Sequence, residues 1–143
     1  SSGSASNSDL SSGSWGDPPH NVTGRASKYQ ERIARTFGDA PPAPGQEFQL
    51  GGKWFDGVKR SANKLLEAKG EGYAQILRDL VDKKNITGPL DELAKEMEGQ
   101  AKICREFGTS IDWHVAEEAA YKRLKQVATD KGVTDVVTVI YTK

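Results

Sequence analysis

The stretch from residue 47 to residue 69 most constrains the fold, because it contains short strand-like segments joined by two turns. The first segment, Glu47 to Leu50, is separated from Lys53 to Val58 by Gly51-Gly52, and paired glycines accept the positive φ angles of a two-residue hairpin turn. The polar stretch Lys59 to Asn63 then leads into a third segment, Lys64 to Lys69. The sequence therefore predicts three consecutive antiparallel strands.

The second turn determines which charged side chains meet. If it is centred between residues 61 and 62, Asp56 lies opposite Glu67, and opposed Cβ atoms in such a pair are roughly 4.5 to 5.5 Å apart. Because side chains alternate along a strand, Glu67 and Lys69 project to the same face about 6.5 Å apart. Two carboxylates this close can share one hard divalent cation. The pattern predicts a metal site with Lys69 beside it.

Other predicted elements lie on both sides of these strands and alternate between helical and strand periodicity. They are a helix over residues 26–37, helices over 73–81 and 89–107, a strand over 110–116, a helix over 117–131 and a strand over 135–141. The order is helix, three-strand meander, helices, strand, helix, strand. This order predicts an α/β fold with a mixed sheet.

Composition limits the number of domains and the classes of partner. Residues 1–25 are rich in Ser, Gly and Pro, so we expect a disordered linker before one folded domain over residues 26–143. No apolar run approaches the length of a membrane span, and we expect no membrane partner. Twenty Lys and Arg balance twenty Asp and Glu, so nucleic-acid binding must use a local patch. The single cysteine, Cys104, excludes an internal disulfide.

The order of elements and the Asp…Glu-x-Lys triplet together resemble the restriction-endonuclease-like (PD-(D/E)xK) superfamily. Five ordered blocks narrow this resemblance to the restriction-endonuclease-fold toxin domains of bacterial polymorphic toxins, including type VI secretion effectors. The blocks are Tyr29-Gln30, Phe55-Asp56-Gly57, Leu66 to Gly70 with Gly72-Tyr73, Gln100, and Trp113 to Glu117. The similarity covers roughly Lys28 to Tyr141.

The resemblance implies a nuclease that is secreted by a bacterial secretion system and acts in the cytoplasm of a competing cell. It also implies a cognate immunity protein that protects the producer, and in some cases a secretion chaperone. The superfamily often places a glutamate on its first helix, where Gln30 and Glu31 are the candidates here.

Phosphodiester hydrolysis requires a polarised phosphate, an activated water molecule and relief of charge on the leaving oxygen. Mg²⁺ or Mn²⁺ held by Asp56 and Glu67, with the Ala68 carbonyl as a third ligand, can provide the first two. Lys69 can orient the water or stabilise the developing charge. In the alternative interpretation, Asp56 and Glu67 are exposed strand residues and Lys69 forms a surface salt bridge with one of them.

Further polar residues are candidates for supporting roles. Gln100 shares the inward stripe of its helix and either bonds a metal-bound water or substrate phosphate, or caps a backbone group. Gln30 either supports the site or only anchors its helix to the sheet. Glu31 is rotated about 100° from Gln30, which favours a surface role. His114 is interpreted as a structural or supporting histidine in preference to a general base.

Three basic residues are candidates for contacting DNA phosphates, although solvated surface is the commoner role of such charges. They are Arg32, Lys59 and Lys64. The leading hypothesis is a metal-dependent, sequence-nonspecific DNase that acts as an antibacterial toxin. The alternatives are an RNase toxin that uses the same site and a catalytically silent module that binds a partner.

Overall fold

The computed structural model describes residues 9–19, 24–43, 45–72 and 89–143. The helices are α1 (Gly24–Phe37), α3 (Pro89–Phe107) and α4 (Glu118–Asp130), with short 3-10 turns at Asp9–Ser12 and Arg60–Ala62. The strands are β2 (Ser14–Gly16), β3 (Glu47–Leu50), β4 (Lys53–Phe55), β5 (Gly57–Lys59), β6 (Lys64–Lys69), β7 (Ser110–Val115) and β8 (Val137–Tyr141). Among the helices described, none combines the length and apolar character needed to cross a membrane.

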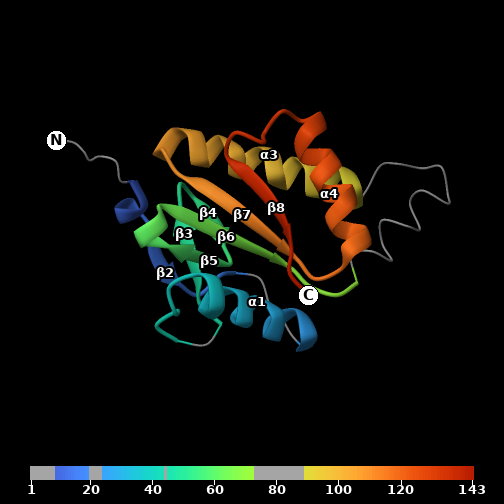
Figure 1. Ribbon diagram of the computed structural model, residues 1–143. Coiled ribbons are helices and arrows are strands. Elements are labelled where there is room, and N and C mark those ends of the chain that lie inside the picture. Colours follow the sequence, from blue (N-terminus) through green and yellow to red (C-terminus); the bar gives the residue numbers. More distant parts are fainter. Residues whose placement is uncertain (1–8, 20–23, 44, 73–88) are drawn as a thin grey trace.

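The strands form two sheets. Strands β5, β6, β7 and β8 lie in that order in a four-stranded sheet, while β2, β3 and β4 form a three-stranded sheet near one end of it (Figure 1). Strand β5 is antiparallel to β6, whereas β7 is parallel to both β6 and β8. The four-stranded sheet is therefore mixed, and the predicted α/β fold is confirmed.

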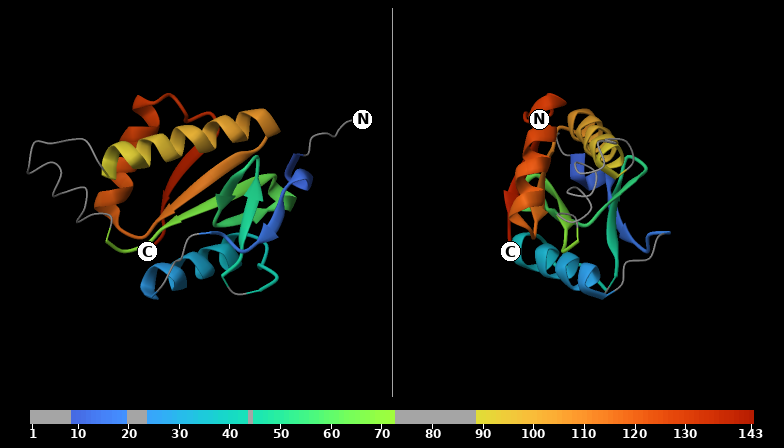
Figure 2. Two further views of the ribbon diagram at one scale, coloured as in Figure 1. Left: turned by 180° about the vertical axis from the view of Figure 1, so that it is seen from behind. Right: turned by 90° about the vertical axis from the view of Figure 1, so that its right-hand side faces the viewer.

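Helices cover both faces of the four-stranded sheet. Helices α3 and α4 lie on one face and α1 lies on the other (Figures 1 and 2). Met97, Ala101 and Cys104 recur at helical spacing on α3 and are buried in the core. On α1, Ile33 and Ala34 are also buried. Side chains on the central strands are therefore withdrawn from water on both faces.

Gly38 allows the end of α1 to lie directly against strand β5. A Cβ atom at this position would be 2.6 Å from the Val58 carbonyl oxygen, a separation that a larger residue could not keep. The next residue, Asp39, donates its N–H to the same Val58 oxygen at 2.7 Å. This close approach fixes α1 beside the β5–β6 hairpin.

Most predicted elements are found with boundaries that shift by no more than two residues. The strands predicted over Glu47 to Leu50 and Lys64 to Lys69 have the same limits in the structure, as does the helix predicted over residues 89–107. The helix predicted over residues 73–81 lies outside the described residues.

The strand predicted over Lys53 to Val58 requires correction, because Asp56 divides it into β4 and β5. Strand β4 pairs with β3 and β5 pairs with β6, so the predicted meander is divided between two sheets. The cause is local. The Oδ2 atom of Asp56 accepts a hydrogen bond from the Ala68 N–H at 2.7 Å, so a side-chain carboxylate takes the place of a backbone acceptor at this point.

The predicted linker also requires correction over part of its length. Strand β2 pairs antiparallel with β3, and Leu10 is buried in the hydrophobic core. The Trp15 ring packs edge-on against Phe48, with ring centroids 5.6 Å apart. Composition alone did not reveal this strand or its core contacts, because the few apolar residues are dispersed in a stretch rich in Ser and Gly.

Candidate active site

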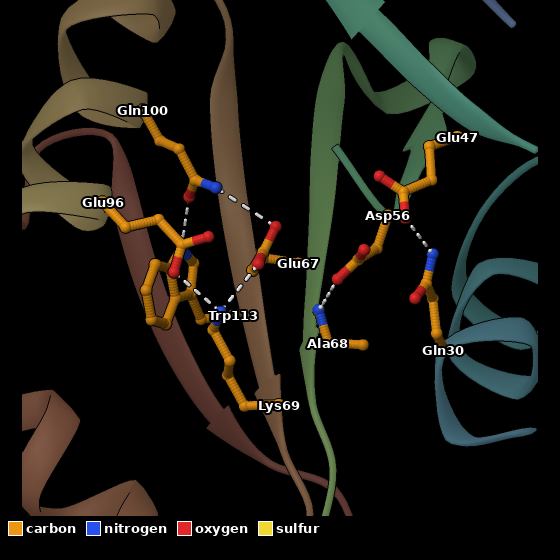
Figure 3. Close-up of polar contacts among 9 residues, drawn as sticks. All are labelled: Gln30, Glu47, Asp56, Glu67, Ala68, Lys69, Glu96, Gln100 and Trp113. Atoms are coloured by element: carbon orange, nitrogen blue, oxygen red, sulfur yellow. Dashed lines mark hydrogen bonds and ion pairs between the residues drawn. The ribbon is translucent and has the colours of Figure 1, made fainter. Parts of the chain in front are cut away.

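Asp56 and Glu67 lie at the open end of the β5–β6 hairpin. The register pairs Gly57 with Leu66, so Asp56 and Glu67 are the next residues along their strands. This is the arrangement that the sequence predicts, with the difference that Asp56 lies at the break between two strands. Its side chain is bonded to the Ala68 N–H of the neighbouring strand, as Figure 3 shows.

Glu67 and Lys69 form a buried ion pair. Glu67 lies opposite Trp113 and Lys69 opposite Val115 in the parallel ladder, so both side chains project to the face covered by α3. The Lys69 Nζ atom is 2.9 Å from Glu67 Oε2, and each residue is only 5% exposed. The alternative of a surface salt bridge is therefore wrong for this pair.

Gln100 of α3 holds the other oxygen of Glu67. Its Nε2 atom donates to Glu67 Oε1 at 3.1 Å, and its Oε1 atom accepts a hydrogen bond from Trp113 Nε1 at 2.8 Å (Figure 3). All three residues are buried. Gln100 thus connects Glu67 of β6 to Trp113 of β7, in place of the backbone cap that was one of its predicted roles.

Lys69 has a second acidic neighbour that the sequence analysis missed. Glu96 of α3 places Oε1 2.7 Å from Lys69 Nζ, and the same nitrogen lies 4.9 Å from the centre of the Trp113 ring. Glu96 is partly exposed, whereas Glu67 is buried. Lys69 therefore lies between a buried carboxylate and one that reaches solvent. Glu96 sits one helical turn before Gln100, which is the sequence signal that could have identified it.

The two strand carboxylates resist ionisation in this environment. Burial raises the pKa of Asp56 from 3.8 to about 7, and the nearby positive charge of Lys69 opposes this shift only in part. Burial also raises the pKa of Glu67 well above its ordinary value, and the Asp56 carboxylate adds to that increase. It is difficult for both acids to be ionised at the same time. A cation bound between them would therefore be strongly favourable.

A further acid, Glu47 of β3, is buried beside Asp56 (Figure 3). Its Oε2 atom accepts a hydrogen bond from Gln30 Nε2 at 2.8 Å, and Glu47 is 2% exposed. Gln30 on α1 therefore supports a carboxylate next to Asp56. The sequence analysis missed Glu47, although an acidic residue on the strand that forms a hairpin with the Asp56 segment was the available signal.

Two predicted accessory residues have their contacts elsewhere. Glu31 is exposed and forms an ion pair with Arg35 at 3.1 Å, as its predicted surface role requires. His114 is buried, stacks on Phe37 with ring centroids 4.3 Å apart, and bonds Thr142 Oγ1 through Nδ1 at 2.8 Å. Burial lowers the pKa of His114 below 6.5. These contacts agree with the structural role favoured for it.

The predicted DNA-contacting residues differ in their surroundings. Lys59 is exposed beside the hairpin turn. Lys64 lies 3.1 Å from Asp112 Oδ2, so it has a carboxylate partner. Arg32 is exposed and donates to the Lys143 carbonyl oxygen at 2.7 Å. Lys59 and Arg32 are therefore exposed to a phosphate, although Arg32, like Lys64, already has a hydrogen-bonding partner.

The donor chemistry suits a small, hard divalent cation. Asp56 and Glu67 supply only oxygen atoms, which Mg²⁺ and Mn²⁺ prefer, and Mg²⁺ commonly uses one or two carboxylates while keeping several waters. Across the part of the chain that the structure describes, no three or more His, Cys, Asp and Glu residues are grouped so that they could hold a metal together. The residues fit an ion bound by few protein ligands.

A protein-family model described as "Restriction endonuclease fold toxin 5" matches residues 26–118, which is more than half of the chain. The chain belongs to this toxin family. The matched region of this restriction-endonuclease-fold toxin begins in α1 and ends at the start of α4, and it includes Asp56, Glu67, Lys69 and Gln100. Membership indicates a nuclease toxin. A search of curated proteins found no match.

Proposed function

We propose that this restriction-endonuclease-fold toxin is a metal-dependent DNase without sequence specificity. The observation that carries the proposal is the buried ion pair of Glu67 and Lys69, 2.9 Å apart, beside a second carboxylate with a raised pKa. Burying such charges is costly for a fold, and their concentration in one place is typical of a functional site.

Asp56 and Glu67 would hold the cation, with the Ala68 carbonyl as a third candidate ligand. When bound, Mg²⁺ or Mn²⁺ would polarise the scissile phosphate and make water a stronger nucleophile. Because Gln100 fixes one oxygen of Glu67 and Lys69 approaches the other, Glu67 is held in one orientation before any ligand arrives. A preorganised ligand loses less entropy on binding.

Lys69 is the proposed catalytic amine. Its Nζ atom can orient the attacking water or stabilise the charge that develops on the phosphate oxygens. The Lys69 Nζ atom has Glu67, Glu96 and the Trp113 ring as neighbours, and these groups attract a positive charge. Lys69 therefore acts here as an electrostatic group.

The wider role follows from the toxin family. We propose delivery by a bacterial secretion system, action in the cytoplasm of a competing cell and neutralisation by a cognate immunity protein, with a loading chaperone in some systems. Lys59 and Arg32 are candidates for contacts to the DNA backbone, which carry no sequence information.

Cleavage of supercoiled plasmid by the purified protein tests the proposal. We expect nicking with Mg²⁺ or Mn²⁺, none with a chelator, and a loss of at least roughly 100-fold in Glu67→Ala. Glu98→Ala is the matched control, because Glu98 is an exposed acid on α3. Equal cleavage by the Glu67→Ala variant would refute the assignment. Cleavage of RNA but not of plasmid would favour the RNase alternative.

A further inference from the structure

Lys53 is an exposed lysine at the start of β4. Its side chain has no ion-pair or hydrogen-bond partner among the residues that the structure describes. Leu50 is its register partner across the hairpin, and Lys53 shares a face of β4 with the buried Phe55. The lysine therefore extends from the core-facing side of the hairpin, where α3 lies.

The end of the Lys53 side chain lies against Gly99 of α3. A Cβ atom at residue 99 would be 3.1 Å from both Cε and Nζ of Lys53, and these are the only described atoms outside the helix that it would meet within 4 Å. Glycine inside a helix is unfavourable relative to alanine, because it loses more conformational freedom on folding. The visible effect of the missing side chain is to give the Lys53 amine a place against the helix.

The tip of the β3–β4 hairpin lies along the same side of α3 (Figures 1 and 2). A Cβ atom at Gly51 in the turn would be 2.7 Å from Ile103 Cδ1. Ile103 follows Gly99 by one helical turn, so the turn residue and Lys53 contact successive turns of one edge of α3. The position of the Lys53 amine is therefore set by the packing of the whole hairpin.

This edge of α3 leads to the proposed site. Glu96 precedes Gly99 by three residues, which places it about 60° around the helix and about 4.5 Å along its axis. The Oε1 atom of Glu96 is 2.7 Å from Lys69 Nζ. Lys53 also precedes Asp56 by three residues, a span of about 10 Å in an extended strand. Both connections place the Lys53 amine beside the site.

A nuclease needs positive charge for the phosphates next to the one that it cleaves, because such contacts hold the nucleic acid in position. Lys69 is poorly placed to provide this charge, since its amine already lies between Glu67 and Glu96. Successive phosphates of one DNA strand are separated by about 3.4 Å of duplex axis. An amine displaced by a similar distance from the reaction centre can contact a phosphate one or two nucleotides away.

We propose that Lys53 binds the DNA backbone one or two phosphates from the cleaved bond, and that Gly99 is its positioning residue. This inference deepens the proposed function and rests on it for the choice of DNA as the substrate. Because Lys53 has no carboxylate partner in the described structure, it can contact a phosphate without breaking an ion pair. The contact carries no sequence information, in keeping with a nonspecific nuclease.

The test is binding of a short fluorescein-labelled DNA duplex, measured by fluorescence anisotropy in a chelator over a range of salt concentrations. Each phosphate contact contributes about 0.9 to the slope of log affinity against log salt. We expect Lys53→Met, which keeps most of the stem, to reduce the slope by about that amount and to weaken binding roughly 5- to 10-fold at about 0.1 M salt. Lys53→Arg keeps the charge and should bind like the unmodified protein. The matched control is Lys122→Met, which removes an exposed lysine of α4 and should also leave binding unchanged.

Gly99→Leu tests the positioning role. The leucine side chain would occupy the place of the Lys53 amine, so this variant should lose most of the affinity that Lys53→Met loses. The double variant should bind no more weakly than Lys53→Met alone, because both changes remove one contact. Leucine favours a helix over glycine, so the melting temperature should not fall. Additive losses would show that Gly99 does not act through Lys53.

Unchanged affinity and salt slope in Lys53→Met would overturn the inference, provided that circular dichroism shows a folded protein. Equal losses in Lys53→Arg and Lys53→Met would also overturn it, because the charge would then have no role. Absence of duplex binding by the unmodified protein at every salt concentration would have the same consequence.

Plasmid cleavage separates this inference from the proposed function. If the unmodified protein cleaves plasmid, Glu67→Ala does not, and Lys53→Met keeps the full salt slope, the inference fails and the function stands. If Lys53→Met reduces the slope but the unmodified protein cleaves no plasmid with Mg²⁺ or Mn²⁺, the function fails and Lys53 remains a DNA contact.

Discussion

The Nζ atom of Lys69 lies between two carboxylates of different kinds, 2.9 Å from Glu67 Oε2 and 2.7 Å from Glu96 Oε1. Glu67 comes from the same strand as Lys69 and is buried, whereas Glu96 comes from α3 and is partly exposed. The buried partner fixes the amine within the site. The exposed partner occupies a position that an incoming phosphate could take.

Replacing Lys69 with methionine should abolish cleavage and leave a folded protein. Methionine has nearly the length of the lysine stem and is accommodated by apolar surroundings, whereas the charge at the reaction centre is lost. A loss of at least roughly 100-fold in plasmid cleavage is expected. Circular dichroism checks the fold, and Lys95→Met on the exposed face of α3 is the control. Cleavage within a few-fold of normal would remove Lys69 from the mechanism.

Glu96→Gln should have an effect opposite in direction to Lys69→Met. Removing this negative charge frees Lys69 to contact a phosphate and lowers the repulsion that DNA meets at the site. We expect KM for plasmid to fall several-fold at low salt, with a smaller difference at high salt because of screening. A loss of cleavage comparable with that of Lys69→Met would instead make Glu96 a catalytic residue.

Trp113→Phe tests the support behind Glu67. The substitution removes the indole N–H and leaves the buried Gln100 Oε1 atom without its donor. An unsatisfied buried acceptor costs about 1 to 3 kcal/mol, so the unfolding free energy should fall by that amount in urea titrations. Trp54→Phe removes a partly buried indole elsewhere and serves as the control. An equal loss in both variants would mean that ring size, and not the hydrogen bond, determines the effect.

The strand residues of the site could be predicted because their geometry is local. Glu67 and Lys69 share a face through the two-residue period of β6, and the turn length places Asp56 next to Glu67. Neither relationship depends on how distant parts of the chain pack together. The same holds for Gln100, whose inward position follows from the periodicity of α3.

Glu47 and Glu96 were missed because their sequence signals give a position but not a partner. Glu47 comes next to Asp56 across the hairpin in which Phe48 pairs with Phe55. Glu96 lies one helical turn before Gln100, but its contact with Lys69 depends on tertiary packing. The break at Asp56 was equally hidden, because it depends on a hydrogen bond between its side chain and the Ala68 backbone. Local periodicity carries no information on such contacts.

The pH dependence of stability offers a direct test of the buried carboxylates. Without metal, the pKa of Asp56 is about 7 in the folded protein against an ordinary value of 3.8. The folded state therefore holds this proton more tightly than the unfolded chain does. This contribution to stability is complete below about pH 4 and is lost as the pH rises through about 7. The raised pKa of Glu67 acts in the same direction.

Melting temperatures measured in a chelator test this expectation. Over this pH range, the melting temperature of the unmodified protein should decrease more than that of Asp56→Asn, whose side chain does not titrate. Mn²⁺ should reduce the difference, because cation binding favours the ionised carboxylates. Parallel pH profiles for the two proteins would show that Asp56 ionises normally and would remove the electrostatic basis for a cation at this site.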